Sequence, residues 1–391
     1  LSCMDFTPSR SLFWYGENCI FFLCGSTILS NTRLLLSITF YGTKCTLSDE
    51  KTLPFRYLTK FAETSCNSLG IELTQHKRFS VCENQETTIM RAFEFRKEGL
   101  EYLQKLPLEE KITLSKNLIV SCMETFGEQV YISFSGGKDS TVLSSLVCSL
   151  KPDILHLFSD TGYEYPETLS FVEEERQRGK NIVPVRPVCR DGSVWTFERV
   201  VATYGYPLFS KAIANGIRTY RHAKTPVTKQ HALDYLGQMY PKALSYLNHN
   251  ISDLCCEKLK KAPLKRMAKR MQTQCSIIGT LAEESQVQKR DWIAYGSNIF
   301  FQKKDNQCRP PSFWTERDIW DYIELYKIPV SDLYGQGYQR NGCMFCGFGL
   351  CAERRKLGIN RFERLSLTHP KEYDYMVSRW ASLFKACGIP Y

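Results

Sequence analysis

The stretch QVYISFSGGKDS, from Gln129 to Ser140, decides the predicted fold. Its first half, Gln129–Phe134, is rich in β-branched and aromatic residues, which predicts a short buried strand. The hexapeptide SGGKDS (residues 135–140) follows at once, and a helical pattern continues from it to Leu150. A strand, a glycine turn and a helix in this order are typical of an α/β protein whose turn binds an anion.

The chemistry of the hexapeptide favours a phosphate ligand. Gly136 and Gly137 let the backbone approach a phosphate and present its N–H groups, and the following helix directs its positive end at the anion. Lys138 adds a mobile positive charge, and Asp139 is suited to hold Mg²⁺ or to orient the loop. Hydroxyl donors are offered by Ser133, Ser135 and Ser140.

The spacing is not that of the Walker A motif, because the glycines are adjacent rather than separated by four residues. The strand–SGGKDS–helix arrangement resembles the PP-loop of the ATP pyrophosphatase superfamily, whose members cleave ATP between the α and β phosphates. The alternative is an ordinary glycine turn in an α/β unit.

The rest of the chain repeats the alternation of strands and helices. Further strands are predicted at Ile154–Ser159, Ile182–Val185 and Ser276–Gly279, and helices at 92–124, Pro166–Arg178, Glu257–Met271 and Thr315–Tyr326. This alternation predicts an α/β fold with a Rossmann-like, doubly wound, mainly parallel sheet covered on both faces, as in the adenine nucleotide alpha-hydrolase-like proteins that the loop resembles. Residues 205–255 carry several turn signals and predict an irregular substrate loop.

Three regions follow from these patterns. Residues 1–88 have no repeat, sustained period or recognisable motif, and are predicted to be an N-terminal extension of unknown fold. Residues 89–285 form the predicted nucleotide-binding α/β domain. Residues 286–391 form a predicted helical C-terminal part that carries a C-x-x-C motif.

Composition limits the class of protein. Of 391 residues, 43% are hydrophobic and 24% charged, which is typical of globular proteins. No apolar run reaches the length of a membrane helix, so we expect no membrane association and a cytoplasmic location. The 17 cysteines are then expected to be thiols or metal ligands. A net charge of +10 fits anionic partners.

A second candidate loop, Ser159-Asp160-Thr161-Gly162, ends the second predicted strand. Ligands of open α/β sheets bind at the carboxyl ends of the strands, so Asp160, Thr161 and Gly162 are candidate nucleotide contacts. Together with the following Tyr-Glu-Tyr, the loop resembles the D-T-G-x-E-x-P segment of the phosphoadenosine phosphosulfate (PAPS) reductase family, which lies near the adenosine. A purely structural turn is the alternative.

Four cysteines form a candidate metal centre: Cys255, Cys256, Cys343 and Cys346. The C-x-x-C turn lets two thiolates face one centre, and the distant pair completes four ligands. Adjacent cysteines suit the separate irons of a cubane better than one tetrahedral ion. The pattern is similar to that of sulfonucleotide reductases and DNA-phosphorothioation sulfurtransferases, which implies a [4Fe-4S] cluster; zinc and no metal are the alternatives. Cys351 is a candidate substitute ligand.

The resemblance to the PAPS reductase family covers about residues 112–391, with two departures. Leu281 stands where the family often has arginine, and Cys387 lies in Lys-Ala-Cys-Gly rather than in the reductases' Glu-Cys-Gly. The loop also keeps Lys138, as ATP-cleaving members do. These points favour ATP cleavage coupled to sulfur transfer, with Mg²⁺ as a further cofactor and Lys138, Asp139 and Asp160 as catalytic residues.

Two other functions stay open. One is a reductase that releases sulfite from a sulfated adenine nucleotide, with Cys387 as nucleophile and thioredoxin as electron donor. The other is a non-catalytic iron–sulfur protein that binds a nucleotide or nucleic acid. For the sulfur-transfer function, tRNA or DNA is a candidate acceptor, and a cysteine desulfurase or a thioredoxin-type protein is a candidate donor.

The basic residues between Lys258 and Arg270 crowd one predicted helix. They are either a solvated helix face, a phosphate or sulfate contact near the cysteines, or part of a nucleic-acid track. Arg218, Arg221 and Lys224 would extend such a track.

Overall fold

The structure, a computed structural model, divides into two compact units, Leu1–Glu98 and Gly99–Tyr391. It describes residues 12–16, 19–23, 96–189, 191–301 and 305–391. In the first unit, β1 (Leu12–Gly16) and β2 (Cys19–Leu23) pair as an antiparallel hairpin. The rest of the predicted extension, 1–88, lies outside the described residues.

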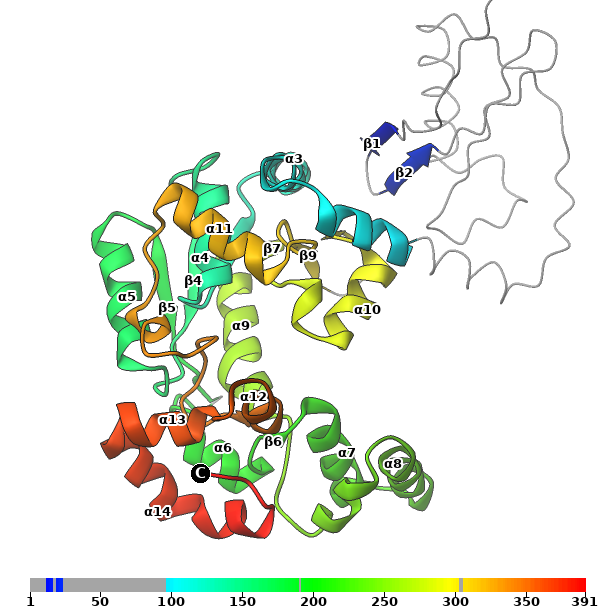
Figure 1. Cartoon of the computed structure of the whole chain (residues 1–391), viewed down its shortest axis with the longest axis vertical. Coiled ribbons are helices and arrows are strands. Elements are labelled where there is room, and N and C mark those ends of the chain that lie inside the picture. The colour runs from blue at the N-terminus through cyan, green and yellow to red at the C-terminus, as the bar shows by residue number, and fades with distance from the viewer. Residues whose placement is uncertain (1–11, 17–18, 24–95, 190, 302–304) are drawn as a thin grey trace, which may run out of the picture. The chain divides into compact units, whose positions relative to one another are not determined.

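The second unit is built on a six-stranded sheet (Figure 1). Its order is β5 (Ile182–Val185), β4 (His156–Ser159), β3 (Val130–Phe134), β7 (Cys275–Ile278), β9 (Asn306–Cys308), β8 (Asn298–Ile299). Neighbouring strands are parallel except for β8, which pairs with β9 in the antiparallel sense. The predicted α/β fold with a mainly parallel sheet is confirmed.

The order of the strands places two loops at the centre of the sheet. The chain moves outward from β3 to β4 and β5, then returns to the other side of β3 with β7. The turns after β3 and β7 therefore lie side by side at the point where the winding reverses, which is where ligands of such sheets bind. A Cβ atom on Gly279, just after β7, would lie 2.8 Å from the carbonyl oxygen of Asp139.

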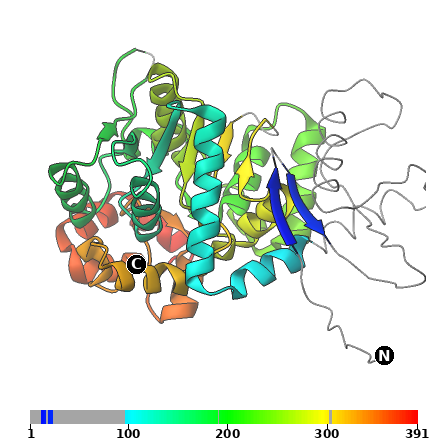
Figure 2. The same cartoon turned by 90° about the horizontal axis from the view of Figure 1, so that it is seen from above.

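Helices cover both faces of the sheet. Ile132 and Phe134 pack into the larger hydrophobic core, whereas their neighbour Tyr131 packs on the opposite face with Ala268. The larger core is formed with α3 (Leu108–Phe126), α4 (Lys138–Cys148), α5 (Pro166–Gln177) and α11 (Glu316–Tyr326), and the opposite face is covered by α9 (Ala262–Arg270). In Figure 2, α3 is the long cyan helix across the middle of the view. Alternating side chains on β3 thus give the doubly wound arrangement.

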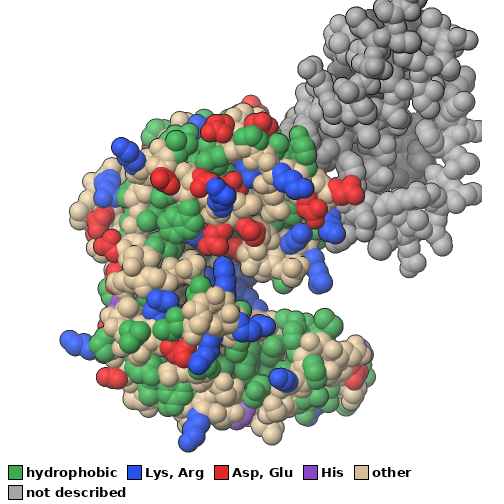
Figure 3. All heavy atoms as spheres, in the orientation of Figure 1, with side chains coloured by type: hydrophobic (Ala, Val, Ile, Leu, Met, Phe, Trp, Pro, Cys, Tyr) green, Lys and Arg blue, Asp and Glu red, His purple; other side chains and the backbone are tan. Residues whose placement is uncertain are grey.

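A second hydrophobic core lies below the sheet in Figure 1. Rings of Phe197, Tyr206, Trp380 and Phe384 meet there at centroid distances of 5.2–5.4 Å. It is formed by α6 (Phe197–Tyr204), β6 (Leu208–Phe209), α7 (Lys211–His222), α8 (Pro226–Met239), η1 (Pro241–Tyr246), β10 (Gly347–Phe348), α12 (Leu350–Leu357), α13 (Arg361–Thr368) and α14 (Pro370–Ala386). Figure 3 shows the surface hollowed between α10 (Gln286–Tyr295) and α7.

The prediction of an irregular loop over residues 205–255 is wrong, because this stretch contains α7 and α8. The side chains of Ser210 and Thr225 cap the two helices by accepting backbone N–H groups. Leu236 of α8 packs closely on Gly216 of α7. A Cβ atom added to Gly216 would lie 2.6 Å from the Leu236 side chain. Ser210 and Thr225 are therefore the N-caps of a helical hairpin.

Two predicted helices are interrupted by proline. The helix predicted over 92–124 is broken, because residues 96–105 are helical and α3 begins only after Pro107. The basic helix begins as a π-turn, η2 (Glu257–Lys261), before α9. Pro263 has no N–H to donate to the carbonyl of Leu259, which instead accepts the Ser159 hydroxyl at 3.3 Å.

The other predicted elements agree with the structure to within a few residues, and the capping box of Thr315 and Asp318 at the start of α11 is confirmed. The larger core takes residues from both sides of the predicted boundary at 285/286, which stays a prediction. Among the described residues, no helix combines the length and apolarity needed to cross a bilayer.

Candidate nucleotide and thiol site

Residues 135–140, which we call the PP-loop after the motif that they resemble, form a closed turn packed against α5. The Ser140 hydroxyl accepts the Ser135 N–H at 3.2 Å and donates to the Gly137 carbonyl at 2.9 Å. Gly136 has a φ of +71°, and a Cβ atom on it would lie 2.9 Å from Val172. Both the conformation and the close packing therefore require glycine at this position. Ser133 lies just before the turn, in β3.

Lys138 is buried at the first position of α4, with 5% of its surface exposed. Its Nζ lies 3.3 Å from Asp139 Oδ1 and 3.5 Å from Oε1 of Glu316, the first residue of α11. The buried ammonium is thus balanced by two carboxylates, one local and one distant in sequence. These contacts hold the charge of Lys138 beside the loop.

Asp139 belongs to a group of acids around Lys138. Burial raises the pKa of Asp139, and the positive charge of Lys138 offsets only part of that rise. Burial also raises the pKa of Glu284, and the negative charge of Asp139 adds to this. Carboxylate oxygens close to a phosphate site are typical ligands of Mg²⁺. Glu284 and Glu316 were not among the predicted site residues, because no local pattern links them to Lys138.

A cavity of about 470 Å³ lies beside this acidic group. Its lining includes Glu283, Glu284 and Ser285, which follow the turn after β7. The backbone N–H of Glu316 donates to Glu283 at 2.7 Å, which ties this turn to α11. The turn after β7 is therefore joined to the PP-loop through Lys138 and Glu316.

Asp160 ends β4 but turns toward β5. Its Oδ2 accepts a hydrogen bond from Arg186 at 2.9 Å, and its Oδ1 accepts the Gly162 N–H at 3.1 Å. The first contact joins the carboxylate to the residue that follows β5, and the second is made within the loop itself. Asp139 is therefore better placed than Asp160 to act beside Lys138.

Thr161 connects the second loop to the cysteines. Its N–H and its hydroxyl both donate to the Glu164 carboxylate at 2.9 Å. Glu164 also pairs with Lys260 at 3.3 Å and forms an isolated antiparallel bridge with Cys343. The Thr161 Oγ1 lies 3.5 Å from the Cys343 sulfur. The predicted nucleotide loop thus directly contacts a predicted metal ligand.

The structure brings the four predicted ligand cysteines together. Burial raises the pKa of Cys255, and the negative charges of Cys343, Cys256 and Cys346 raise it further. Burial likewise raises the pKa of Cys343, to about 12. The turn between Cys343 and Cys346 is closed by a backbone hydrogen bond of 3.1 Å. Cys351 is exposed on α12.

Cationic side chains adjoin the thiols. Burial lowers the pKa of Lys260, but the charges of Cys343 and Glu164 outweigh this and the net shift is upward. Burial lowers the pKa of Arg361 too, but the charge of Cys346 and the hydrogen bond and charge of Glu353 together shift it upward. Two cations beside four thiols suit an anionic centre.

The residue types of the four thiols are those of an iron–sulfur ligand set. In the part of the chain that the structure describes, no three His, Cys, Asp or Glu side chains converge closely enough to hold one metal ion. Four soft thiols from two separate segments match the ligand set of a [4Fe-4S] cluster, whose four irons each take one sulfur. Cys255, Cys256, Cys343 and Cys346 are the residues that would hold it.

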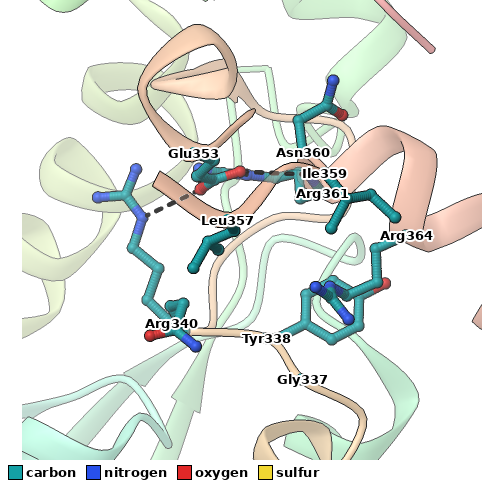
Figure 4. A pocket seen from close by; sticks show the side chains of 10 residues that line it. Gly337, Tyr338, Arg340, Glu353, Leu357, Ile359, Asn360, Arg361 and Arg364 are labelled. Carbon is teal, nitrogen blue, oxygen red and sulfur yellow. Dashed lines mark hydrogen bonds and ion pairs between the residues drawn. The ribbon is translucent and has the colours of Figure 1, made fainter. Parts of the chain in front are cut away.

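A small pocket is lined by side chains from residues 337–340 and 353–364 (Figure 4). Arg361 donates to Glu353 and to the Phe348 carbonyl, the latter at 3.0 Å, and Arg340 lies 3.8 Å from Glu353. The cavity is about 20 Å³, which is room for about one water molecule. This pocket is therefore filled by an ion-pair network of Arg340, Glu353 and Arg361.

Cys387, the candidate nucleophile, is 2% exposed and follows α14 as its C-cap. Burial raises its pKa to about 11, which keeps the thiol protonated near neutral pH. It packs in the second core with Phe384 and Ile389.

Much of the basic helix is already paired. Lys265 binds Asp305 at 2.6 Å, Arg266 donates to the Val188 carbonyl at 2.7 Å, and Lys258 lies 4.8 Å from the centre of the Tyr204 ring. Arg218 binds Asp253 at 2.6 Å. These side chains are engaged in contacts within the protein, which weakens the prediction that they form a continuous nucleic-acid track.

Comparisons with known proteins show which family domain the chain contains. Residues 129–196 and 208–347, just over half of the chain, match the phosphoadenosine phosphosulfate reductase domain. Adenosine 5'-phosphosulfate reductase of Halalkalibacterium halodurans is 25% identical over 61% of this chain and 82% of its own length. Adenosine 5'-phosphosulfate reductase 2 of Bacillus subtilis is 24% identical over 68% and 84%.

Two solved structures are also similar. The phosphoadenylyl-sulfate reductase of Candida auris, in a phosphate complex, has a TM-score of 0.38 and 16% identity, and covers 68% of this chain and 98% of its own. The U34-tRNA thiolase NcsA of Methanococcus maripaludis, with its [4Fe-4S] cluster, has a TM-score of 0.32 and 14% identity, and covers 72% and 80%. From the extent of the domain match, the chain belongs to the phosphoadenosine phosphosulfate reductase domain family.

Proposed function

We propose that the chain is an enzyme that cleaves ATP at the α-phosphate and thereby activates an acceptor for sulfur transfer. One observation carries the proposal: the glycine turn before buried Lys138 is hydrogen-bonded to Asn341, which lies two residues before Cys343 of the thiol group. Glu164, which contacts Cys343, joins the second nucleotide loop to the thiols. Activation and sulfur delivery can therefore take place in one continuous site.

In the proposed first step, an acceptor oxygen attacks the α-phosphorus of ATP. The α–β phosphoanhydride bond breaks, and pyrophosphate leaves with the electron pair. The loop N–H groups and Lys138 stabilise the charge on the departing pyrophosphate. Asp139, together with Glu284, would hold a Mg²⁺ ion that neutralises the phosphates.

In the second step, a sulfide equivalent displaces AMP from the adenylated acceptor. A [4Fe-4S] cluster held by Cys255, Cys256, Cys343 and Cys346 would position the sulfur donor, because with four cysteine ligands none of its irons is free to bind the sulfide itself. Lys260 offsets negative charge beside the thiols. A cysteine desulfurase is the proposed class of sulfur donor, and tRNA or DNA the proposed class of acceptor.

A second candidate function is sulfonucleotide reduction, because the curated relatives described above are adenosine 5'-phosphosulfate reductases. It requires a nucleophilic cysteine that reaches the sulfur of the nucleotide. The burial of Cys387 disfavours this function, since that side chain would have to leave the second core to react.

One experiment separates the two functions. The protein is purified anaerobically, its iron and zinc are measured, and it is incubated in turn with ATP, adenosine phosphosulfate and PAPS. Formation of AMP and pyrophosphate from ATP, reduced about 10²-fold or more in Lys138→Ala, supports the proposal. The matched control is Lys151→Ala, a lysine paired with exposed Glu128, which retains activity. Sulfite release that is lost in Cys387→Ser, without ATP cleavage, would replace the proposal by the reductase.

A further inference from the structure

One segment contacts both the PP-loop and the thiols. We call residues 331–346 the strap; it begins at Ser331, the cap of η4 (Asp332–Tyr334), and ends at Cys346. The Tyr334 hydroxyl oxygen accepts the backbone N–H of Lys138 at 2.7 Å. Seven residues later, the Asn341 side-chain amide donates to the Ser135 carbonyl at 2.7 Å. The strap is therefore attached to the PP-loop at two points.

The Tyr334 oxygen lies where a phosphate oxygen is expected. Lys138 is the first residue of α4, and the first N–H groups of a helix have no partner within the helix. Such N–H groups are the donors that bind a phosphate at a helix N-terminus. Burial raises the pKa of Tyr334 despite the N–H groups of Lys138 and Asn341 that face its oxygen. The neutral Tyr334 hydroxyl thus accepts a hydrogen bond from the Lys138 N–H, a donor that is suited to an anion.

Asn341 covers the glycine of the same turn. A Cβ atom on Gly137 would lie 2.3 Å from Asn341 Oδ1, so the amide rests on the surface that a phosphate would approach. Lys138 Nζ is engaged as well, by Asp139 and Glu316. A phosphate in the PP-loop would therefore have to compete with Tyr334 and Asn341.

The other end of the strap is attached to the second nucleotide loop. Met344 donates its N–H to the Tyr163 carbonyl at 2.8 Å, and Cys343 bridges to Glu164. Cys343 follows Asn341 by two residues, with Gly342 between them. Because so short a linker cannot absorb a large displacement, moving Asn341 also shifts the backbone at Cys343.

We propose that Tyr334 and Asn341 are positioning residues that compete with the nucleotide phosphate for the PP-loop, so that nucleotide binding releases the strap and repositions Cys343. The inference rests on the proposed nucleotide binding and adds its coupling to the thiols. It makes Tyr334 an internal competitor, so removing its hydroxyl strengthens nucleotide binding. If the Tyr334 hydroxyl instead contacted the bound nucleotide, removing it would weaken nucleotide binding.

The test uses the full chain, the variants Tyr334→Phe and Asn341→Ala, and the probe Mg²⁺–α,β-methylene-ATP. The loss of one competing neutral hydrogen bond should tighten binding about fivefold in Tyr334→Phe. The matched control is Tyr338→Phe, also on the strap, whose hydroxyl bonds to Thr368 at 2.9 Å and not to the PP-loop. Its affinity for the probe should equal that of the wild type. Weaker or unchanged binding in Tyr334→Phe overturns the proposal.

Hydrogen exchange gives a second, independent measurement. In the wild type, the probe should slow exchange in peptides covering residues 135–141 and speed it in those covering 331–342. In Tyr334→Phe and Asn341→Ala without the probe, the 331–342 peptides should already exchange faster than in the wild type. Slower exchange of both segments with the probe would mean that the strap clamps onto the nucleotide, and the competition model would be wrong.

The measurements also distinguish this inference from the proposed function. If the wild type does not bind the probe at all, the proposed function and the strap's role both fail. If the wild type binds the probe and cleaves ATP, but neither variant changes affinity or exchange, the coupling fails and the proposed function stands.

Discussion

Glu164 and Cys343 lie 179 residues apart in the chain, yet they pair as an antiparallel bridge with the thiol sulfur 3.9 Å from the Glu164 carboxylate. Glu164 is 4% exposed and also pairs with Lys260, so the positive charge of Lys260 balances the negative charge of Glu164 at the bridge. A carboxylate beside a thiol is unfavourable when both are ionised, and Lys260 offsets that repulsion. This relationship fixes the distance between the nucleotide loop and the thiol group.

The first prediction concerns this bridge. Glu164→Gln keeps an oxygen acceptor for Thr161 but removes the partner charge of Lys260. We expect a loss of about 2 kcal/mol in the free energy of unfolding, because hydrogen bonds to a buried charge are worth roughly that much. Urea unfolding measures it. Glu174→Gln removes an exposed pair with Arg178 and should change stability by less than about 0.5 kcal/mol. Equal effects of the two variants would contradict the role given to Glu164.

The second prediction concerns Gly279. A Cβ atom here would lie 2.8 Å from the Asp139 carbonyl, and backbone cannot give way as a flexible side chain can. Gly279→Ala should therefore displace the PP-loop, destabilise the chain by about 1–3 kcal/mol and weaken nucleotide binding. Calorimetric titration and urea unfolding check this. In Gly237→Ala, on α8, the nearest contact is an ordinary 3.9 Å, and stability should be retained or slightly raised.

The third prediction separates the cysteines. Cys343→Ser and Cys256→Ser should each lose most of the bound iron and the visible absorption of anaerobically prepared protein, because serine is a poor ligand for iron in such clusters. Cys351→Ser should keep both, since Cys351 is exposed on α12. Iron content per chain and the absorption spectrum are the measurements. Iron loss in Cys351→Ser with full iron in Cys256→Ser would identify Cys351 as the ligand.

The fourth prediction rests on His156, which is fully buried in β4. Its Nδ1 faces the Ile154 carbonyl at 2.9 Å, so Nδ1 carries the proton, and its Nε2 accepts from the Ser144 hydroxyl at 2.8 Å. Lys180 donates to the same hydroxyl at 3.0 Å. Burial, with the nearby charge of Lys180, lowers the pKa of His156 to about 4 from the usual 6.5.

The sign of the pH effect follows from that downward shift. The unfolded chain takes up a proton as the pH falls through 6.5, whereas the folded chain resists it until about pH 4, so acid favours unfolding. The contribution of neutral His156 to the free energy of unfolding is fully present above pH 6.5. That free energy should fall by about 2 kcal/mol between pH 7 and pH 5. Urea unfolding at both pH values measures the change. His156→Gln should flatten this slope, and the exposed-site variant His231→Gln should keep it; a slope unchanged in His156→Gln would refute the assignment.

Local sequence was enough to predict the elements around the PP-loop. The strand and helix on either side of the loop, and the capping box of Thr315 and Asp318, depend on dihedral preferences and hydrogen bonds within a few residues. Such interactions are encoded where they occur, so a pattern in the sequence reveals them. The alternation of strands and helices predicted the parallel sheet for the same reason.

Errors arose where one local signal had two meanings. The stretch 205–255 was predicted to be an irregular loop, but in the structure Ser210 and Thr225 cap α7 and α8 within it. Polar caps and turns use the same residue types, and only the packing of Leu236 on Gly216 decides between them. In the same way, the charges of the basic helix were visible in the sequence, whereas the pairing of Lys265 with Asp305 was not.

The sequence by itself determined the glycine turn between β3 and α4 and the spacing of the four thiols. Tertiary structure decided that Glu316 meets Lys138, that Tyr334 and Asn341 rest on the PP-loop, and that Cys343 bridges to Glu164. The physical reason is that these contacts join segments more than 170 residues apart, whose meeting depends on strand order and on the packing of two cores rather than on any local preference.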